Sequence, residues 1–242
     1  MNQNAIDFTL FVACYNEAGN IIGTLETLID ALEEIDLTWE IIVIDDASSD
    51  GSSELVNKYI NEHPALPILL KVNKTNKGLA QNYIEGAFIG KGKYYRMICG
   101  DNVEPKEALV KVFKHIGQAD IIIPYHVLAE GKSYFRKILS KAYTLIINLL
   151  TGYQIRYYNG MAVCLRYNTM RWHANYRGFG FQADLITRLL DEKFNYVEVP
   201  INVVERRSGK STALSLKNIL SILHTILDIF IRQLGKILYR EK

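Results

Sequence analysis

The sequence predicts an α/β protein built on a mostly parallel, doubly wound β-sheet, to which amphipathic helices are appended. Three observations lead to this fold class. Apolar, strand-like runs alternate with helix-like segments over the first hundred residues. Residues 41–44, Ile-Ile-Val-Ile, form an uninterrupted β-branched run, which is typical of a strand buried on both faces of a parallel sheet. That run ends in two adjacent carboxylates and a Ser/Asp/Gly turn, where open α/β sheets place their ligands.

The bulk composition is that of an ordinary globular domain. The chain has 242 residues, of which 49% are hydrophobic and 22% are charged, so it can bury a sizeable core. A net charge of +2 is too small to indicate nucleic acid as a partner. Cys14, Cys99 and Cys164 are scattered, which favours a reducing, cytoplasmic setting. No signal peptide or uncharged run of about 20 residues is visible, so the protein is expected to be soluble or to lie on a membrane surface.

The elements of the first half follow from the apolar spacing. Strands are expected at residues 7–14, 40–44, 68–72 and 94–99, and helices between them at about 21–32, 55–60 and 79–90. Each expected strand ends in a polar turn, beginning with Tyr-Asn-Glu-Ala-Gly-Asn at 15–20. This alternation predicts a parallel, doubly wound half.

The second half adds strands and two amphipathic segments. Strands are expected at 121–124, 162–165 and 196–204, with a helix at about 182–190. Residues 132–158 begin with four basic side chains and continue as an uncharged apolar run, which suits a helix lying on a bilayer. The tail, 214–238, has one narrow polar stripe on an otherwise apolar helix. The stripe consists of Lys217, Ser221, Thr225, Asp228, Arg232 and Lys236.

Four polar strand ends are expected to converge on one edge of the sheet. They are Tyr15–Glu17, Asp45–Asp46, Asn76–Gly78 and Asp101. Taken alone, each is a weak signal, since a polar turn is more often a solvated loop and the aspartate pair could cap a helix. Together they lie where a nucleotide crevice forms in a parallel sheet.

The chain resembles the family-2 glycosyltransferases with the three-layer nucleotide-diphosphosugar transferase (GT-A) fold. FVACYNEAGNI, VIDDASSDGS, NKTNKGLAQNYIEGA and the strand ending in an Asp before Pro105 carry the resemblance over about the first 110 residues. The second half resembles the polyprenyl-phosphate glycosyltransferases more loosely. There the matching positions are Arg136, Ser140 and Lys141, the Asn-Gly of YYNGMAV, the FQAD before a helix, and VEVPINVVERRSGKS.

The resemblance implies roles at the donor site. Asp45 or Asp46 would accept hydrogen bonds from the base or ribose, with Tyr15 and Glu17 completing that end. The loop of Asn76, Lys77 and Gly78 would complete the nucleotide site, and Lys77 could supply positive charge. Asp101 would ligate Mg²⁺ or Mn²⁺ bridging the two phosphates.

The metal motif departs from the family pattern. The usual motif is Asp-x-Asp, whereas this chain has Cys99, Gly100 and Asp101. Cys99 is a poor ligand for a hard cation and suits a buried strand end better. A weakly held cation, or one completed by Asn102 or Glu104, is therefore the expectation.

The resemblance also implies roles on the acceptor side. Arg206 would clamp phosphate oxygens, and Ser211 matches the Gly-x-Ser that follows it; the alternative is a basic surface loop. Arg136, Ser140 and Lys141 would contact the acceptor. Asp184 is the candidate general base for a hydroxyl acceptor, whereas a lipid phosphate would need none. The alternative for Asp184 is a charge favoured at a helix N-terminus.

The resulting hypothesis is an inverting glycosyltransferase that moves a sugar from a nucleotide-diphosphosugar to a membrane-held acceptor, above all a polyprenyl phosphate. It would lie peripherally on the cytoplasmic face of a membrane. The catalytic domain is expected at 1–212, with a nucleotide-sugar half at 1–110 and an acceptor half at 111–212, followed by a helical tail at 213–242. The alternatives are a soluble transferase acting on a glycan, whose helices form a homodimer interface, and a non-catalytic sugar-nucleotide-binding module.

Overall fold

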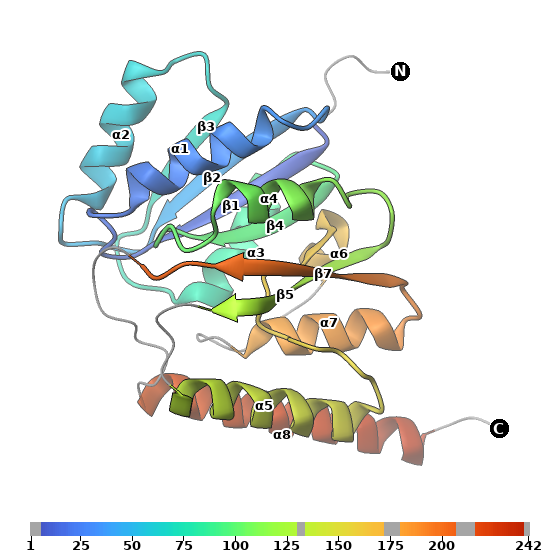
Figure 1. Ribbon diagram of the computed structural model, residues 1–242. Helices are drawn as coiled ribbons and strands as arrows, with labels where there is room; N and C mark the ends of the chain where they lie inside the picture. Colours follow the sequence, from blue (N-terminus) through green and yellow to red (C-terminus); the bar gives the residue numbers. More distant parts are fainter. Residues whose placement is uncertain (1–5, 130–133, 172–179, 207–215, 240–242) are drawn as a thin grey trace.

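The strands of the described residues form one seven-stranded sheet that carries helices on both faces (Figure 1). The computed structural model describes residues 6–129, 134–171, 180–206 and 216–239. The strands are β1 (Phe8–Cys14), β2 (Trp39–Asp45), β3 (Ile68–Val72), β4 (Tyr94–Cys99), β5 (Ile121–Ala129), β6 (Val163–Leu165) and β7 (Tyr196–Val203). The helices are α1 (Ile21–Leu32), α2 (Ser52–Glu62), α3 (Leu79–Ile89), α4 (Lys106–Phe113), α5 (Tyr134–Thr151), α6 (Arg166–Arg171), α7 (Phe181–Asp191) and α8 (Leu216–Leu238).

The sheet topology creates a crevice beside the central strand β1. The strand order is β3-β2-β1-β4-β6-β5-β7. The strands β3, β2, β1 and β4 are parallel, and so are β5 and β7, whereas β6 is antiparallel to both of its neighbours. The chain runs outward from β1 to β3 and then returns to the other side of β1 for β4. At such a reversal the carboxyl ends of the strands leave an open crevice.

The central strands are buried on both faces, as the apolar runs predict. In β2, Ile41 and Val43 join one core with α1, α2 and α4. Ile42 and Ile44 face the opposite way and join a second core with α3 and α7. This alternation follows from the two-residue period of a strand. The predicted α/β class with a mostly parallel sheet is therefore confirmed.

The helices α5 and α8 form an additional layer beyond α7. They run side by side at one end of the molecule (Figure 1). Tyr143 and Ile147 of α5 and Ile229 of α8 extend the core that contains α7. The two amphipathic segments expected from the sequence thus pack on each other and on the same face of the protein.

The helix α8 turns the inner part of its polar stripe toward the protein. Thr225 is buried, and Arg232 binds Asp184 and Asp191 of α7. Lys236 binds Asp191 as well. Since one side of α8 meets α7 through charges, most of its apolar side chains are left to point away from the sheet.

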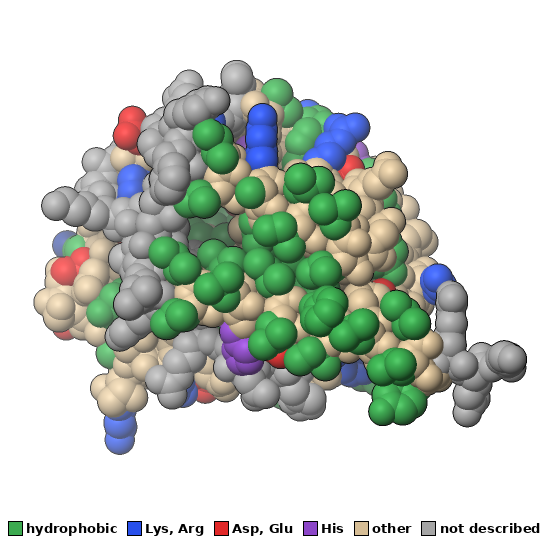
Figure 2. All heavy atoms as spheres, turned by 90° about the horizontal axis from the view of Figure 1, so that it is seen from below, with side chains coloured by type: hydrophobic (Ala, Val, Ile, Leu, Met, Phe, Trp, Pro, Cys, Tyr) green, Lys and Arg blue, Asp and Glu red, His purple; other side chains and the backbone are tan. Residues whose placement is uncertain are grey.

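The exposed apolar side chains of α5 and α8 together form a surface that we call the outer apolar face. Figure 2 views the molecule from this end and shows hydrophobic side chains gathered over it. No helix in the described ranges is long and apolar enough to cross a membrane. The outer apolar face consists of Ile138, Leu139, Leu145, Ile146 and Leu149 of α5 and Ile219, Leu220, Leu223, Leu227, Phe230, Ile231, Leu234, Ile237 and Leu238 of α8.

Three features differ from the sequence-based expectation. The helices α4 and α6 were not expected. The strand β5 extends to Ala129, beyond the predicted end at residue 124, because it pairs with β7 along most of its length. The strand β6 is short and antiparallel, so the second half of the sheet does not continue the parallel pattern.

All three cysteines are free thiols.

Candidate active site

The loops that follow β1 and β2 interlock at the carboxyl edge of the sheet. The backbone N–H of Asn16 donates to Ser48 Oγ at 2.9 Å, and the N–H of Glu17 donates to Ser52 Oγ at 2.9 Å. Tyr15, at the start of the first loop, is 51% exposed. The polar strand ends that the sequence singles out therefore do meet at one edge, with Tyr15 accessible to a ligand.

The carboxylate of Asp46 is used within the fold. Its Oδ1 accepts hydrogen bonds from Asn73 Nδ2 at 2.9 Å and from the backbone N–H of Lys77 at 2.8 Å. Its Oδ2 accepts one from the N–H of Gly78 at 2.9 Å. Asp46 is 5% exposed. This carboxylate therefore shapes the loop of residues 73–78, and its contact with the base or ribose stays a prediction.

Asp45 is also directed into the protein. It is 1% exposed, and its Oδ1 accepts a hydrogen bond from the N–H of Ser48 at 2.8 Å. Its Oδ2 lies 3.6 Å from Cys14 Sγ. Burial, reinforced by Asp45, raises the pKa of the Cys14 thiol to about 12. Like Asp46, Asp45 holds a loop beside the crevice rather than presenting an open carboxylate to it.

The loop of residues 73–78 is joined to β2 and to α3. Asn76 Nδ2 donates to the backbone oxygen of Asp46 at 3.2 Å. Lys77 Nζ binds Glu85 of α3 at 3.0 Å, so its charge is already paired. Gly78 has a φ of 87°, which favours glycine at this position. The loop is a preformed wall of the crevice, and Lys77 contributes less positive charge than the sequence suggested.

Asp101 follows β4 and faces a different environment. Its Oδ1 is buried and has no hydrogen-bond partner in the described parts of the chain. Burial raises the pKa of the Asp101 carboxyl to about 6. The Arg206 guanidinium opposes this rise in pKa, whereas Glu17 and Glu104 add to it. A buried carboxylate oxygen without a partner is costly unless a cation or a donor comes to meet it.

Glu17 and Arg206 form an ion pair beside Asp101. Arg206 Nη2 lies 2.6 Å from Glu17 Oε1 and 2.7 Å from Oε2, although the two residues are far apart in the sequence. The side chains are 15% and 19% exposed for Glu17 and Arg206 respectively, so the pair is largely desolvated. Asn20 Nδ2 also donates to Glu17 Oε2 at 2.7 Å. The structure thus brings the predicted site residues Glu17, Asp101 and Arg206 together.

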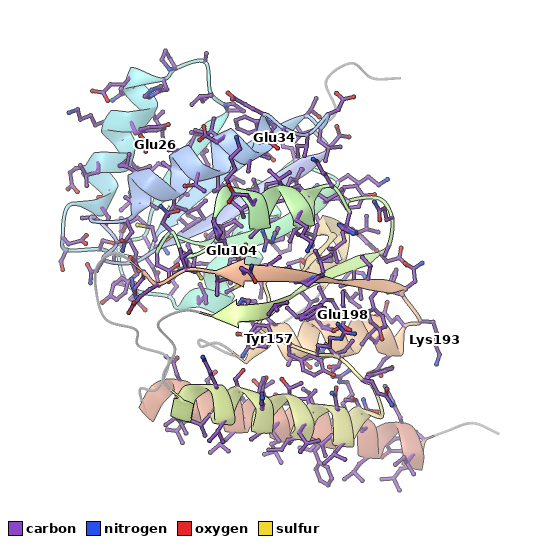
Figure 3. All side chains as sticks on the ribbon, in the orientation of Figure 1. Glu26, Glu34, Glu104, Tyr157, Lys193 and Glu198 are labelled. Atoms are coloured by element: carbon purple, nitrogen blue, oxygen red, sulfur yellow. The ribbon has the colours of Figure 1, made fainter. Side chains whose placement is uncertain are left out.

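A buried ion pair behind Asp101 was not expected from the sequence. Arg96 of β4 is fully buried, and it donates to Glu104 Oε2 at 2.7 Å and to the backbone oxygen of Met161 at 2.9 Å. Figure 3 shows Glu104 on the segment between β4 and α4, near the end of β7. The signal available was a lone arginine in an apolar strand, which must find a partner if it is buried. The pair anchors the segment that carries Asp101.

The side chains around Asp101 provide part of the ligand set that a divalent cation needs. Mg²⁺ and Mn²⁺ prefer oxygen ligands, and they are commonly held by one or two carboxylates together with substrate phosphates. The orphaned Oδ1 of Asp101 is such a ligand. Cys99 offers a thiol, which is a poor ligand for these hard cations, so it does not replace a carboxylate. Within the described ranges no group of three His, Cys, Asp or Glu side chains is arranged to hold a metal.

Replacing Asp101 by asparagine should stabilise the cation-free protein at high pH. Because the folded pKa of about 6 exceeds the ordinary value of 3.8, the unfolded chain loses this proton first as the pH rises. Wild-type stability therefore falls between about pH 4 and pH 6, and the cost persists above that range. Asp101→Asn should remove a cost on the order of 2 kcal/mol at pH 8 but almost none at pH 4.

Urea unfolding in the presence of a chelator measures this difference. Asp36→Asn is the matched control, because Asp36 is exposed and the same chemical change there should not affect stability at either pH. An equal effect of Asp101→Asn at both pH values would contradict the titration of a buried carboxyl.

Asp184 does not occupy the position of a general base. Its side chain is 1% exposed and lies between α7 and α8. Its Oδ2 is 2.8 Å from Arg188 Nε, and its Oδ1 is 3.2 Å from Arg232 Nη2. A base must reach the proton that it abstracts, and this carboxylate is enclosed by two guanidinium groups. The observed contacts bind α8 to α7, and the role of Asp184 as a general base stays a prediction that these contacts do not support.

The residues expected to contact an acceptor are described only in part. Ser140 is half-buried and Lys141 is exposed, both near the start of α5. The side chain of Arg136 and the whole of Ser211 lie outside the described residues. Their roles remain predictions.

The fold and the site define an α/β protein with a crevice at the strand reversal and a carboxylate-arginine cluster beside it. The family model named "Glycosyl transferase family 2" matches residues 9–177. The chain belongs to this family and is a glycosyltransferase. The predicted family and enzyme class are confirmed.

Known proteins similar to this chain include lipid-linked sugar transferases. An undecaprenyl-phosphate mannosyltransferase from Micrococcus luteus is 29% identical over 211 residues, covering 83% of this chain and 84% of that protein. A dolichol-phosphate mannosyltransferase from Saccharomyces cerevisiae is 23% identical, covering 96% and 90%. Among solved structures, glucosyl-3-phosphoglycerate synthase from Mycobacterium tuberculosis, in complex with Mn²⁺, UDP-glucose and phosphoglyceric acid, has a TM-score of 0.69. It is 13% identical, with 93% of this chain and 80% of that chain covered, which supports the shared fold.

Proposed function

We propose that this glycosyltransferase transfers a sugar from a nucleotide-diphosphosugar to a polyprenyl phosphate at the surface of a membrane. The observation that carries the proposal is the outer apolar face. A helix on a soluble protein usually turns its apolar stripe toward the core, whereas α8 binds α7 through Arg232 and Lys236 and leaves its apolar residues exposed. The names of the two lipid-linked relatives support the same acceptor class.

The outer apolar face has the composition of a membrane-binding surface. Large exposed apolar patches on a soluble protein usually mark an interaction site. Here the apolar residues come from α5 and α8, which lie side by side, and Figure 2 shows these residues over a broad area. Lys137 and Lys141 are exposed at the start of α5, where they can meet anionic headgroups. A bilayer accommodates both the apolar area and the basic residues beside it.

The donor would bind with its diphosphate at the cluster of Asp101, Glu17 and Arg206. A divalent cation held there would act as a Lewis acid that stabilises the departing nucleoside diphosphate. The Asp101 carboxylate would hold this cation, and Arg206 would add a guanidinium that binds phosphate oxygens in a fork. Tyr15, exposed at the crevice, would contact the nucleoside. Arg206 and the cation would together place positive charge where the leaving group gains negative charge.

A phosphate acceptor would explain why Asp184 need not act as a general base. An acceptor phosphate oxygen would form a bond to the anomeric carbon while the bond from that carbon to the diphosphate breaks, with inversion of configuration. This oxygen is already ionised at neutral pH, so no general base has to remove a proton. A hydroxyl acceptor would need such a base, and the candidate for it, Asp184, is paired with two arginines between α7 and α8. The geometry therefore favours the phosphate.

A ligand-stabilisation screen followed by a transfer assay tests the proposal. Thermal unfolding would be followed with UDP, GDP and their sugars, with and without Mn²⁺. A ligand at a hundredfold its dissociation constant adds about 2.7 kcal/mol of stability. The donor that stabilises the protein would then be incubated with vesicles containing a polyprenyl phosphate, and the lipid-linked sugar would be measured.

Three outcomes would count against the proposal. Transfer to a soluble glycan, with a stable dimer and no vesicle binding, would favour the soluble transferase. Nucleotide binding without transfer to any acceptor would favour a binding module. Full transfer in the presence of chelator would remove the cation from the mechanism.

A further inference from the structure

We propose that Glu17 supplies the second carboxylate of the divalent-cation site, in the place left by Cys99. This inference rests on the proposed function, since it concerns the cation that accompanies the nucleotide-diphosphosugar. The carboxylate that the family motif lacks here would thus be contributed by the loop after β1 rather than by the end of β4.

The close approach of Glu17 to the Asp101 segment is the first support. Gly100 separates Cys99 from Asp101, and a Cβ added at Gly100 would lie 3.6 Å from Glu17 Cγ. The same Cβ would lie 2.8 Å from the backbone oxygen of Ala13, so a side chain at position 100 would have to push β1 aside. The distance of 3.6 Å is an ordinary van der Waals contact, so the Glu17 side chain lies against the backbone that leads into Asp101.

The charges around this contact are the second support. The Arg206 guanidinium binds both carboxylate oxygens of Glu17, whose side chain lies against the backbone next to Asp101. A positive charge therefore already lies beside the Glu17 carboxylate. Together with the buried, unpartnered Oδ1 of Asp101, this arrangement suits a cation that two carboxylates share.

The alternative ligand Glu104 is held elsewhere. Its Oε2 accepts a hydrogen bond from Arg96 at 2.7 Å, and the Arg96 side chain is fully buried. Moving Glu104 onto a cation would leave that guanidinium without its carboxylate, which is costly in the interior. Glu17, by contrast, is paired with the partly exposed Arg206, which the phosphates of a bound donor can engage instead.

These contacts indicate how the partners of Glu17 would change when the donor binds. When the donor phosphates bind Arg206, Glu17 loses its cationic partner, keeps the hydrogen bond from Asn20, and becomes available to the cation that accompanies the phosphates. The ion pair with Arg206 therefore balances the negative charge of the Glu17 carboxylate until the donor binds. Glu17 acts on the cation and not on the nucleoside.

Electron paramagnetic resonance measures the affinity of the protein for Mn²⁺ and so tests whether Glu17 is a ligand of the cation. Free Mn²⁺ would be titrated with wild type, Glu17→Gln, Cys99→Asp and the double variant, with Mn²⁺ alone and with saturating UDP or GDP. Glu17→Gln should weaken Mn²⁺ binding at least about tenfold, because even outer-shell partners of a metal contribute that much. Adding Cys99→Asp should restore most of the loss. Glu54→Gln, an exposed carboxylate on α2, is the control for charge.

Each outcome separates the inference from the proposed function. Unchanged Mn²⁺ affinity in Glu17→Gln, with Asp101→Asn abolishing binding, would overturn the role of Glu17 while leaving the transferase intact. Failure of wild type to bind any nucleoside diphosphate would count against the proposed function, and a titration of Mn²⁺ with inorganic pyrophosphate, which can engage Arg206 without a nucleoside, would still test Glu17. If Glu17→Gln does not fold, Glu17→Asp keeps the charge that pairs with Arg206 but shortens the side chain, so it should weaken Mn²⁺ binding, and unchanged affinity there would also contradict the inference.

Discussion

Replacing Leu223 and Leu227 by glutamate should weaken binding to lipid vesicles at least about hundredfold. Both side chains belong to the outer apolar face and are more than half exposed, at 56% and 52%. Burying a leucine side chain contributes about 1.5 kcal/mol or more, and every 1.4 kcal/mol changes an affinity tenfold. Two ionised carboxylates at the same depth would add a cost of their own. Co-sedimentation with vesicles containing anionic lipid measures the effect.

The matched control changes two exposed leucines far from this surface. Leu55 lies on α2 and Leu69 on β3, at the opposite end of the molecule from α5 and α8 (Figure 1). Leu55→Glu with Leu69→Glu should leave vesicle binding unchanged. Equal binding by both double variants would show that the outer apolar face does not contact lipid. A shift from dimer to monomer in the α8 variant alone would assign the face to a second copy of the chain.

Replacing Arg232 by methionine should lower the free energy of unfolding by about 3 kcal/mol. Arg232 binds Asp184 at 3.2 Å, Thr187 Oγ1 at 2.6 Å, and Asp191. Its side chain is 17% exposed and that of Asp184 is 1% exposed. Breaking a buried pair by removing one partner typically costs 3–5 kcal/mol, because it leaves the other charge uncompensated. Arg188 still pairs with Asp184, so the lower end is expected.

Urea unfolding of a short series of variants separates charge from packing. Arg188→Met is the control, because this arginine is 43% exposed and should contribute at most about 1 kcal/mol. Combining Arg232→Met with Asp184→Leu should recover most of the lost stability, since the buried Asp184 charge is then removed with its partner and Asp191 keeps Lys236. That double variant should also retain transfer to a phosphate acceptor. Loss of transfer in a folded double variant would return Asp184 to a catalytic role.

The fold could be predicted from the sequence because its strands carry a local signal. The β-branched run of β2 is buried on both faces, and the polar residues that follow β1, β2 and β4 do meet at one edge. The helix α4 was missed because its eight residues are short of the length at which apolar periodicity is clear. The antiparallel β6 pairs through only two residues with each neighbour, so its local sequence carries little information on direction.

Side-chain direction was the part of the site that the sequence could not define. Asp45 and Asp46 follow a strand end, where a carboxylate can face the crevice or the backbone of the next loop, and here both bind backbone N–H groups. The position of Glu17 beside Asp101 depends on contacts between loops that are distant in the sequence, such as those of Glu17 with Ser52 and Arg206. The sequence also showed the polar stripe of α8, but the acidic residues of α7 decide which side of that helix faces the protein.

The inward polar side of α8 also affects how the enzyme meets its acceptor. On the proposed function, the catalytic domain is fixed to a helix that stays at the bilayer surface, so enzyme and lipid phosphate diffuse in the same plane. The rate of their encounter then depends on the number of acceptor molecules per unit of membrane area. Diluting the acceptor with other lipids would slow transfer even when its total amount in the sample is unchanged. Diluting the vesicles in buffer would not, as long as the enzyme remains bound.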